Sequence, residues 1–100
     1  MEFILKCPLK ENLYSLMREV GYRFQGEDKA KSELIFIRPL EGDDYPRFHL
    51  YIKTEGENFI FNLHLDQKRP IYKGVPAHAA EYDGEVVEKE IERIKQILQK

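Results

Sequence analysis

Two stretches of alternating polar and apolar residues constrain the fold of this chain most strongly. Arg47–Thr54 reads RFHLYIKT and Phe59–Leu65 reads FIFNLHL, so every second side chain in each stretch is apolar. Strict alternation is typical of a β-strand that has one buried and one exposed face. Between the two stretches lies Gly56-Glu57, and glycine suits the first central position of a type II′ turn. The sequence therefore predicts a half-buried antiparallel hairpin.

The turn and the alternation together predict the register of this hairpin. A slip of one residue would move all the apolar side chains of one strand to the wrong face. With Glu55 opposite Asn58, counting outward gives three apolar pairs: Phe48 with Leu65, Leu50 with Leu63, and Ile52 with Phe61. On the polar face, the same count gives three further pairs: Arg47 with Asp66, His49 with His64, and Tyr51 with Asn62.

The segments before the hairpin predict one helix and two or three strands. Phe3–Cys7 is a short candidate strand, and helical spacing of leucines predicts a helix over Leu9–Val20 that ends at a glycine. Tyr22–Gln25 could begin a strand, and the next six residues, GEDKAK, indicate a solvated turn. Glu33–Arg38 is apolar on both faces, which favours a central or doubly covered strand.

The C-terminal segment predicts a second helix. Asp83 is a suitable N-cap, acids fill the first turn and lysines the last, as the helix dipole favours. Four apolar residues at helical spacing form one stripe: Val87, Ile91, Ile94 and Leu98. Val86 and Ile97 lie beside this stripe.

Length and element order together predict the fold class. One hundred residues suit a single domain, so we expect residues 1–100 to form one α+β domain. The expected order is (β)-α-β-β-β-α, with an antiparallel sheet of three to four strands and two helices packed on one face.

Charge, cysteine content and hydropathy narrow the class of protein. Cys7 is the only cysteine, so no internal disulfide points to an oxidising compartment. No stretch approaches the ~20 apolar residues of a membrane span. We therefore expect a cytoplasmic protein without a membrane partner. The net charge of −2 argues mildly against a dedicated nucleic-acid binder.

The middle of the chain is nevertheless net positive. Residues 46–76 hold Glu55, Glu57 and Asp66 against five bases, and no acid occurs between Gln67 and His78. Bases beside aromatic side chains can bind phosphate and stack on a nucleobase. This pattern favours a binding module for RNA or another anionic, phosphate-bearing ligand, with these candidate residues: Arg47, Tyr51, Lys53, Asn62, Lys68, Arg69, Tyr72 and Lys73. The alternative is a solvated loop that tucks Ile71 or Tyr72 into the core.

All three histidines lie in the same region and suggest a second hypothesis, a metal-dependent or acid–base hydrolase. Imidazole and carboxylate groups bind divalent metals and transfer protons near neutral pH. The catalytic candidates are His49, His64, Asp66 and His78. The metal-ligand candidates are His64, Asp66, His78 and Glu81. The alternatives are a solvated sheet face and a histidine that only anchors the loop; no cofactor motif is evident, and a divalent metal is the one cofactor considered.

A third hypothesis is a protein-interaction domain without catalytic activity. It predicts an exposed apolar or aromatic patch around Tyr51 and Tyr72. The binding module ranks first among the three hypotheses, so the sequence favours a protein that is not an enzyme without excluding one. The oligomeric state is also left open.

Two resemblances accompany this interpretation. The stretch Leu13–Pro39, with Gly21-Tyr22 after a helix and a strand that ends Phe36-Ile37-Arg38-Pro39, resembles the HicA-type mRNA interferases and the double-stranded-RNA-binding fold. In that toxin family a Gly-Ser-His with a catalytic histidine opens the strand, whereas Lys31-Ser32-Glu33 stands here. The resemblance therefore implies a fold more than an activity.

Three further segments look like an uncharacterised family of small bacterial proteins, a resemblance that implies no activity: Pro46–His49, Asn62–Lys68 and His78–Gly84.

Overall fold

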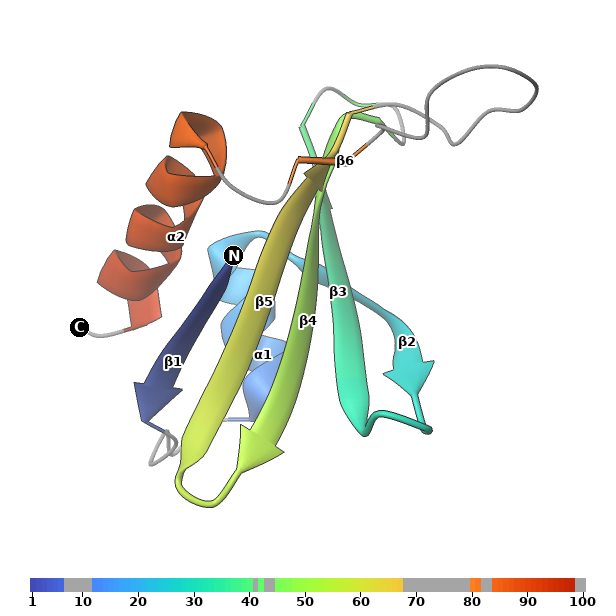
Figure 1. Ribbon diagram of the computed structural model, residues 1–100, viewed down its shortest axis with the longest axis vertical. Coiled ribbons are helices and arrows are strands. Elements are labelled where there is room, and N and C mark those ends of the chain that lie inside the picture. The colour runs from blue at the N-terminus through green and yellow to red at the C-terminus, as the bar shows by residue number, and fades with distance from the viewer. Residues whose placement is uncertain (7–11, 41, 43–44, 68–79, 82–83, 99–100) are drawn as a thin grey trace.

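The computed structural model describes residues 1–6, 12–40, 42, 45–67, 80–81 and 84–98, with the backbone alone at 80–81. Six strands and two helices occur in this part of the chain (Figure 1). In chain order they are β1 (Glu2–Lys6), α1 (Leu13–Val20), β2 (Arg23–Asp28), β3 (Glu33–Pro39), β4 (Arg47–Glu55), β5 (Asn58–Asp66), β6 (Ala80–Glu81) and α2 (Glu85–Leu98).

The strands form one antiparallel sheet in the order β1-β5-β4-β3-β2, and β6 pairs with the far end of β5. The predicted α+β class is confirmed, but the predicted count of three to four strands is wrong. The strands beyond that count are β2 and β6. The sequence indicates β2 only as a possible strand that starts at Tyr22–Gln25, and β6 has two residues, too few for any periodic pattern.

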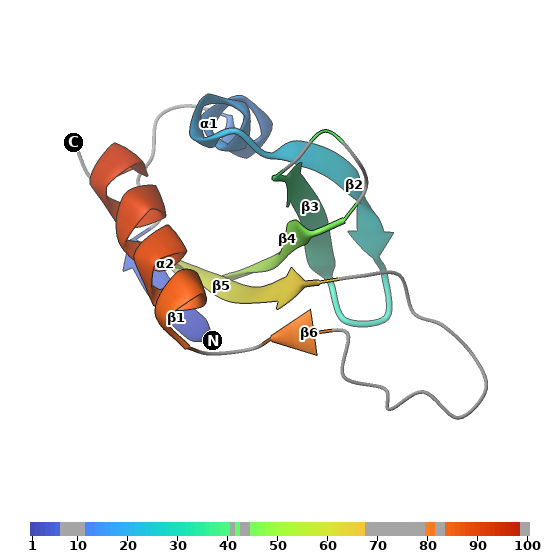
Figure 2. The same ribbon diagram turned by 90° about the horizontal axis from the view of Figure 1, so that it is seen from above.

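Both helices lie on one face of the sheet, which curves around them (Figure 2). Apolar side chains from β1, β3, β4, β5 and both helices meet there in a single core. Phe61, Leu50 and Leu63 of the hairpin are fully buried at its centre, and Met17 and Ile94 cover them from the helices. The opposite face of the sheet, called the outer face below, carries no helix and faces the viewer in Figure 1.

The predicted hairpin and its register are confirmed. β4 pairs with β5 from Arg47–Asp66 through His49–His64 and Tyr51–Asn62 to Glu55–Asn58. Gly56 has a φ of 61°, the positive value that the predicted type II′ turn requires at this position. The polar side chains of the hairpin therefore share the outer face, and the apolar ones enter the core.

β2 corrects the predicted turn over Gly26–Lys31. Gly26, Glu27 and Asp28 pair with Ile35, Leu34 and Glu33, and the register shifts between Phe24 and Gly26. A β-bulge of this kind interrupts strict alternation, which is why the strand pattern stops early in the sequence. The turn itself begins at Lys29, and Asp28 Oδ1 accepts a hydrogen bond from Lys31 N at 3.2 Å.

The two helices follow their predicted faces with corrections at their ends. α1 begins at Leu13 after Asn12, whose side chain accepts a hydrogen bond from Tyr14 N; the predicted start at Leu9 lies outside the described residues. In α2 the predicted stripe is buried. Val86 is 47% exposed, however, because it lies about 100° around the helix from Val87. The predicted N-cap Asp83 also lies outside the described residues.

A buried polar network fastens α2 to the rest of the molecule. Glu90 is 5% exposed and accepts hydrogen bonds from Tyr22 (2.6 Å), from Arg38 (3.4 Å), and from both Nε and Nη2 of Arg93 (2.8 Å each). Arg93 Nη2 also donates to Val20 O at 2.7 Å. We call Tyr22, Arg38, Glu90 and Arg93 the Glu90 network. It ties α2 to the end of α1 and to β3.

The described part of the chain contains no helix long and apolar enough to span a membrane.

Candidate functional site

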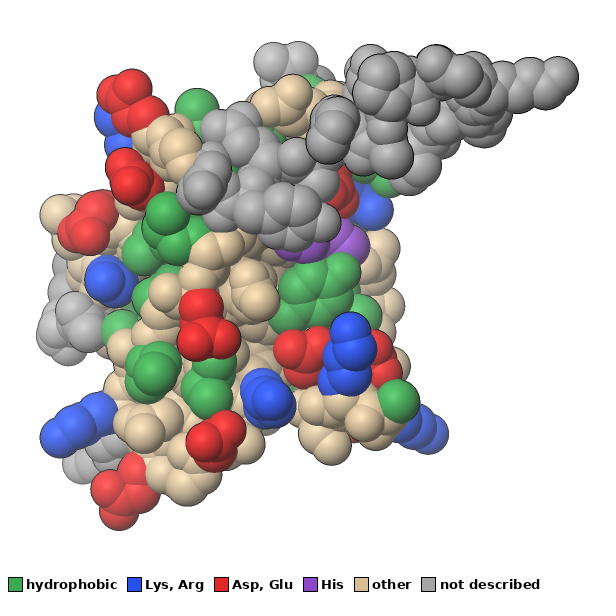
Figure 3. All heavy atoms as spheres, viewed as in Figure 1, with side chains coloured by type: hydrophobic (Ala, Val, Ile, Leu, Met, Phe, Trp, Pro, Cys, Tyr) green, Lys and Arg blue, Asp and Glu red, His purple; other side chains and the backbone are tan. Residues whose placement is uncertain are grey.

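The polar side chains of the hairpin gather at one end of the outer face. Figure 3 views this face and shows histidine side chains beside charged and hydrophobic ones. Arg47 and His49 come from β4, while His64 and Asp66 come from the neighbouring β5. Side chains two residues apart on a strand point to the same face, and directly paired residues lie side by side. We call these four residues the Asp66 cluster.

Asp66 is the centre of this cluster. His49 Nδ1 lies 3.0 Å from Asp66 Oδ2, and His64 Nε2 lies 3.2 Å from Asp66 Oδ1. Arg47 Nε lies 3.5 Å from Oδ2, the oxygen that His49 also contacts. One carboxylate therefore faces three side chains that can carry positive charge.

The cluster is more buried than an ordinary solvated sheet face. His64 is 7% exposed, and the side chains of Arg47, His49 and Asp66 are each about one-seventh exposed. The His49 and His64 rings have centroids 4.9 Å apart, and the Tyr51 ring stacks against both at 4.9 Å and 5.5 Å. This packing holds the imidazoles in place and separates them from bulk water.

The contacts of Asp66 also fix its protonation state. Burial by itself would raise the pKa of its carboxyl group, but hydrogen bonds and favourable charge interactions with His49 and His64 outweigh that effect. The pKa of Asp66 lies well below its usual range as a result. Asp66 is therefore an anion at neutral pH and accepts hydrogen bonds without donating any.

An ionised Asp66 determines which nitrogen of His49 carries the proton. Because the carboxylate can only accept, Nδ1 must donate the 3.0 Å hydrogen bond. In the neutral imidazole, Nε2 then holds the lone pair. Nε2 is buried and has no hydrogen-bond partner among the described residues. Carboxylate–imidazole pairs of this kind orient both general bases and metal ligands.

Arg47 has an unusual environment for a buried guanidinium. Its Cζ lies 4.6 Å from the centroid of the Tyr45 ring, a cation–π contact. Its Nε is buried without a hydrogen-bond partner in the described parts of the chain, because the 3.5 Å contact with Asp66 is an ion pair only. The cluster thus contains a donor group without an acceptor.

The arrangement of His49, His64 and Asp66 fits a divalent metal ion. Each residue offers one ligand atom, and these atoms all lie within 4.8 Å of one another. A metal ion between these atoms would replace the contacts of the two imidazoles with Asp66, and an imidazole nitrogen that binds it would first lose its proton. Two imidazoles and a carboxylate suit Zn²⁺ or Fe²⁺ better than Mg²⁺ or Ca²⁺, which prefer all-oxygen sites.

The other predicted site residues are spread more widely. Asn62 is exposed and lies between its two partners, Tyr51 on β4 and Glu2 on β1. Lys53 is half-buried and lies two residues beyond Tyr51 along β4. Glu81 belongs to β6 and pairs with Leu65 through its backbone; the structure does not describe its side chain. Five predicted residues lie outside the described residues: Lys68, Arg69, Tyr72, Lys73 and His78.

The exposed patch expected around Tyr51 and Tyr72 is not centred on Tyr51, which is half-buried against the histidines. Large exposed apolar side chains in the described segments lie elsewhere, at Ile4, Tyr14, Phe24, Leu40 and Val86.

Two features of these polar clusters escaped sequence reasoning. Tyr45 lies two residues before Arg47 across a proline, and an aromatic residue so close to a buried base is the signal that could have identified the stack. Glu90 lies three residues after Val87 and four before Ile94. A glutamate at such a position on an apolar stripe indicates a buried carboxylate with partners.

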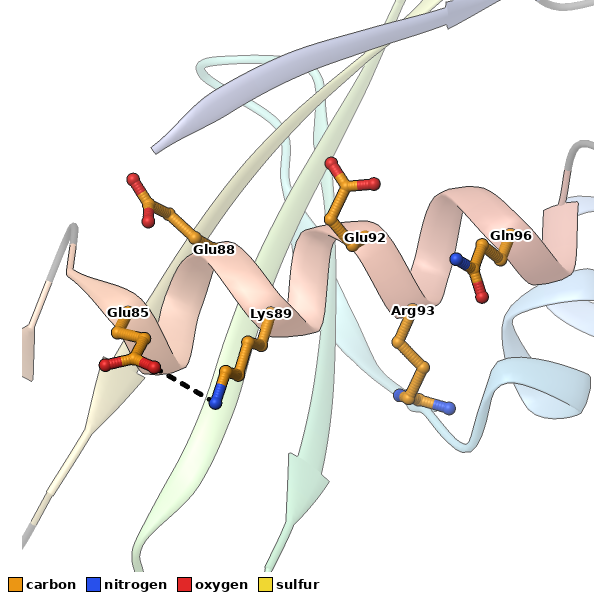
Figure 4. A pocket seen from close by; sticks show the side chains of 6 residues that line it. All are labelled: Glu85, Glu88, Lys89, Glu92, Arg93 and Gln96. Carbon is orange, nitrogen blue, oxygen red and sulfur yellow. Dashed lines mark ion pairs between the residues drawn. The ribbon is translucent and has the colours of Figure 1, made fainter.

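A shallow depression along α2 is a less suitable site. Its lining residues all come from one helix (Figure 4), and Lys89 forms an ion pair with Glu85 at 3.0 Å. Arg93 reaches away from the helix toward the end of α1, as its bond to Val20 O requires. The remaining lining side chains are exposed, as expected for the solvated face of an amphipathic helix.

Comparisons with protein-family models, with curated proteins and with solved structures found no match for this chain.

Proposed function

We propose that the protein binds one divalent metal ion through His49, His64 and Asp66 and uses it as an open centre for hydrolysis. Three protein ligands leave at least one coordination position for water or substrate, which is the arrangement of catalytic zinc sites. A bound ion of this kind supplies a hydroxide nucleophile at neutral pH by lowering the pKa of a coordinated water.

The observation that carries the proposal is the convergence of the three ligand atoms within 4.8 Å. They come from two directly paired strands at the centre of a sheet, whose other face is packed against the core. Ligands on such strands are held more rigidly than ligands on loops. The low pKa of Asp66 adds the negative charge that a cation requires at neutral pH.

Isothermal titration with Zn²⁺, Co²⁺ and Mg²⁺ tests the proposal. We expect one Zn²⁺ or Co²⁺ per chain and much weaker binding of Mg²⁺. Asp66→Asn should lower the affinity for Zn²⁺ by more than about 100-fold, because the only anionic ligand is lost. Glu2→Gln is a matched control, since Glu2 is an exposed carboxylate on the same face. Equal affinities of the wild type and Asp66→Asn would refute the proposed site.

An acid–base mechanism without metal is the second candidate, and one observation favours it. His49 donates Nδ1–H to Asp66, so that Nε2 can act as a general base. If no metal binds, esterase or phosphatase activity that disappears in both His49→Gln and Asp66→Asn would support this alternative. RNA binding through the basic segment stays a prediction, because most of its residues lie outside the described ones.

A further inference from the structure

We propose that the ligand of the Asp66 cluster carries a phosphate group, and that Arg47 binds the phosphate oxygens beside the metal. This inference rests on the proposed function and adds the chemical class of its substrate. The observation that carries it is the buried Nε of Arg47, which has no hydrogen-bond partner among the described residues.

The first argument is the imbalance between donors and acceptors in the cluster. Arg47 has five N–H donors, its side chain is 15% exposed, and its buried Nε has no hydrogen-bond partner within the described segments. A buried donor without an acceptor is unfavourable, because it has lost its hydrogen bonds to water. An oxyanion supplies the missing acceptors and removes this cost.

The second argument is the position of Arg47 relative to the proposed metal. Arg47 Nε and His49 Nδ1 approach the same oxygen, Asp66 Oδ2, at 3.5 and 3.0 Å. A metal ion bound by Asp66 takes up the negative charge that now faces Arg47. The guanidinium would then have no other acidic partner among the described residues. A ligand anion on the metal would therefore lie beside Arg47.

The third argument is the preorganisation of the guanidinium. The Tyr45 ring stacks on Arg47 with its centroid 4.6 Å from Cζ, which limits the orientations of the guanidinium plane. A guanidinium with a fixed plane binds phosphate or carboxylate through two parallel N–H···O bonds.

Charge and geometry favour phosphate over carboxylate. A phosphate monoester carries up to two negative charges and three free oxygens, so it can bind a metal and an arginine at once. Residues 46–76 also form the only net-positive third of the sequence, with five bases against three acids: Arg47, Lys53, Lys68, Arg69 and Lys73 against Glu55, Glu57 and Asp66.

The test measures ³¹P relaxation of inorganic phosphate and of phenyl phosphate in the presence of the Co²⁺-loaded protein, with benzoate as the carboxylate competitor. Arg47→Met keeps the aliphatic stem and removes the charge. We expect it to weaken both phosphate ligands by about tenfold or more, and to leave Co²⁺ affinity unchanged or higher because a cation beside the metal is gone. Arg23→Met is the control, since Arg23 is exposed on edge strand β2, and it should change neither affinity.

The outcomes distinguish a failure of phosphate binding from a failure of metal binding. Equal phosphate affinity in wild type and Arg47→Met, with Co²⁺ bound in both, would overturn the inference and leave the metal site standing. Displacement by benzoate at the same concentration as phenyl phosphate would also overturn it. If Co²⁺ does not bind, the proposed function fails. A shift of the Arg47 Nε–H resonance on adding phosphate to the metal-free protein would then support phosphate binding by Arg47 alone, and an unmoved resonance would overturn that as well.

Discussion

The Asp66 cluster and the Glu90 network contain similar side chains, but they differ in whether their buried polar atoms have hydrogen-bond partners. Each centres on a buried carboxylate that faces arginine and an aromatic or imidazole donor. In the Glu90 network, both carboxylate oxygens of Glu90 accept hydrogen bonds, and Arg93 also donates one to Val20 O. In the Asp66 cluster, Arg47 Nε and His49 Nε2 are buried without partners among the described residues.

This difference separates a structural network from a ligand site. Buried polar groups in folded proteins nearly always have partners, so an exception calls for an explanation. The Glu90 network joins elements far apart in sequence, and the Glu90 side chain at its centre is 4% exposed. The Asp66 cluster joins two adjacent strands that the hairpin already holds together. Its polar side chains therefore add little to joining distant parts of the fold, which fits a ligand site better than a structural network.

The largest effect on stability is expected for Glu90→Ala. The change leaves Tyr22 OH and the Arg93 guanidinium without their shared acceptor, which should lower the free energy of unfolding by about 2–4 kcal/mol. Urea unfolding measures this loss. Glu92→Ala on the exposed side of the same helix should stay within about 0.5 kcal/mol. A Zn²⁺ affinity that fell in Glu90→Ala while the protein stayed folded would contradict the separation of the two regions.

The second prediction concerns Asp66→Asn and zinc. At a free Zn²⁺ concentration of 100 times the dissociation constant, the wild type should gain about 2.7 kcal/mol of unfolding free energy. The variant should gain almost none, because the ligand set is broken. Without zinc, its stability should fall by only about 1–2 kcal/mol, less than in Glu90→Ala. Thermal or urea unfolding with and without zinc gives both values, and equal zinc stabilisation of the two proteins would count against the comparison.

The two regions should also respond to opposite ends of the pH scale. The pKa of Asp66 is lowered in the metal-free protein, so its contribution to stability is full above the unfolded value of about 4. That contribution is lost as the pH falls toward the folded-state pKa. Burial and the nearby Glu90 charge raise the pKa of Tyr22, so its contribution is full below about 10 and is lost at higher pH.

The measurement is the unfolding free energy against pH for the metal-free wild type, Asp66→Asn and Tyr22→Phe. Asp66→Asn should converge with the wild type only on the acid side, and Tyr22→Phe only on the alkaline side. A Tyr22→Phe curve parallel to that of the wild type above pH 10 would show that the phenol does not contribute in this way.

The smallest effect is expected for Lys53→Gln. Lys53 lies on the outer face two residues after Tyr51, whose ring stacks on the histidines, and it has no part in the Asp66 cluster. Stability should change by less than about 0.5 kcal/mol, and Zn²⁺ affinity should not change. A clear loss of affinity for short RNA in this variant would instead favour the binding module predicted from the basic residues.

Local rules were sufficient to predict the hairpin and the histidine–aspartate convergence. Alternation assigns faces, and the glycine turn sets the register, so the pairing of His49 with His64 follows by counting. Asp66 joins them because it lies two residues after His64 on the same strand. None of these steps needs information from a distant part of the chain.

The features that could not be predicted depend on distant partners. Glu90 is buried because Tyr22 and Arg38, 68 and 52 residues earlier, provide donors for it. β2 continues through Gly26–Asp28, a segment with turn-like composition, because β3 pairs with it on the other side of a bulge. The Tyr45 stack depends on the path of the chain before β4, which alternation does not describe.

The most direct test of the open Asp66 cluster is a Zn²⁺ titration followed by long-range ¹H–¹⁵N NMR of the imidazole rings. The spectra report each ring nitrogen separately, so they show which atoms bind the metal. We predict that nitrogen signals of both His49 and His64 shift in a one-to-one titration and do not shift in Asp66→Asn. If both imidazoles keep their wild-type, metal-free nitrogen shifts in excess Zn²⁺, the cluster is no metal site.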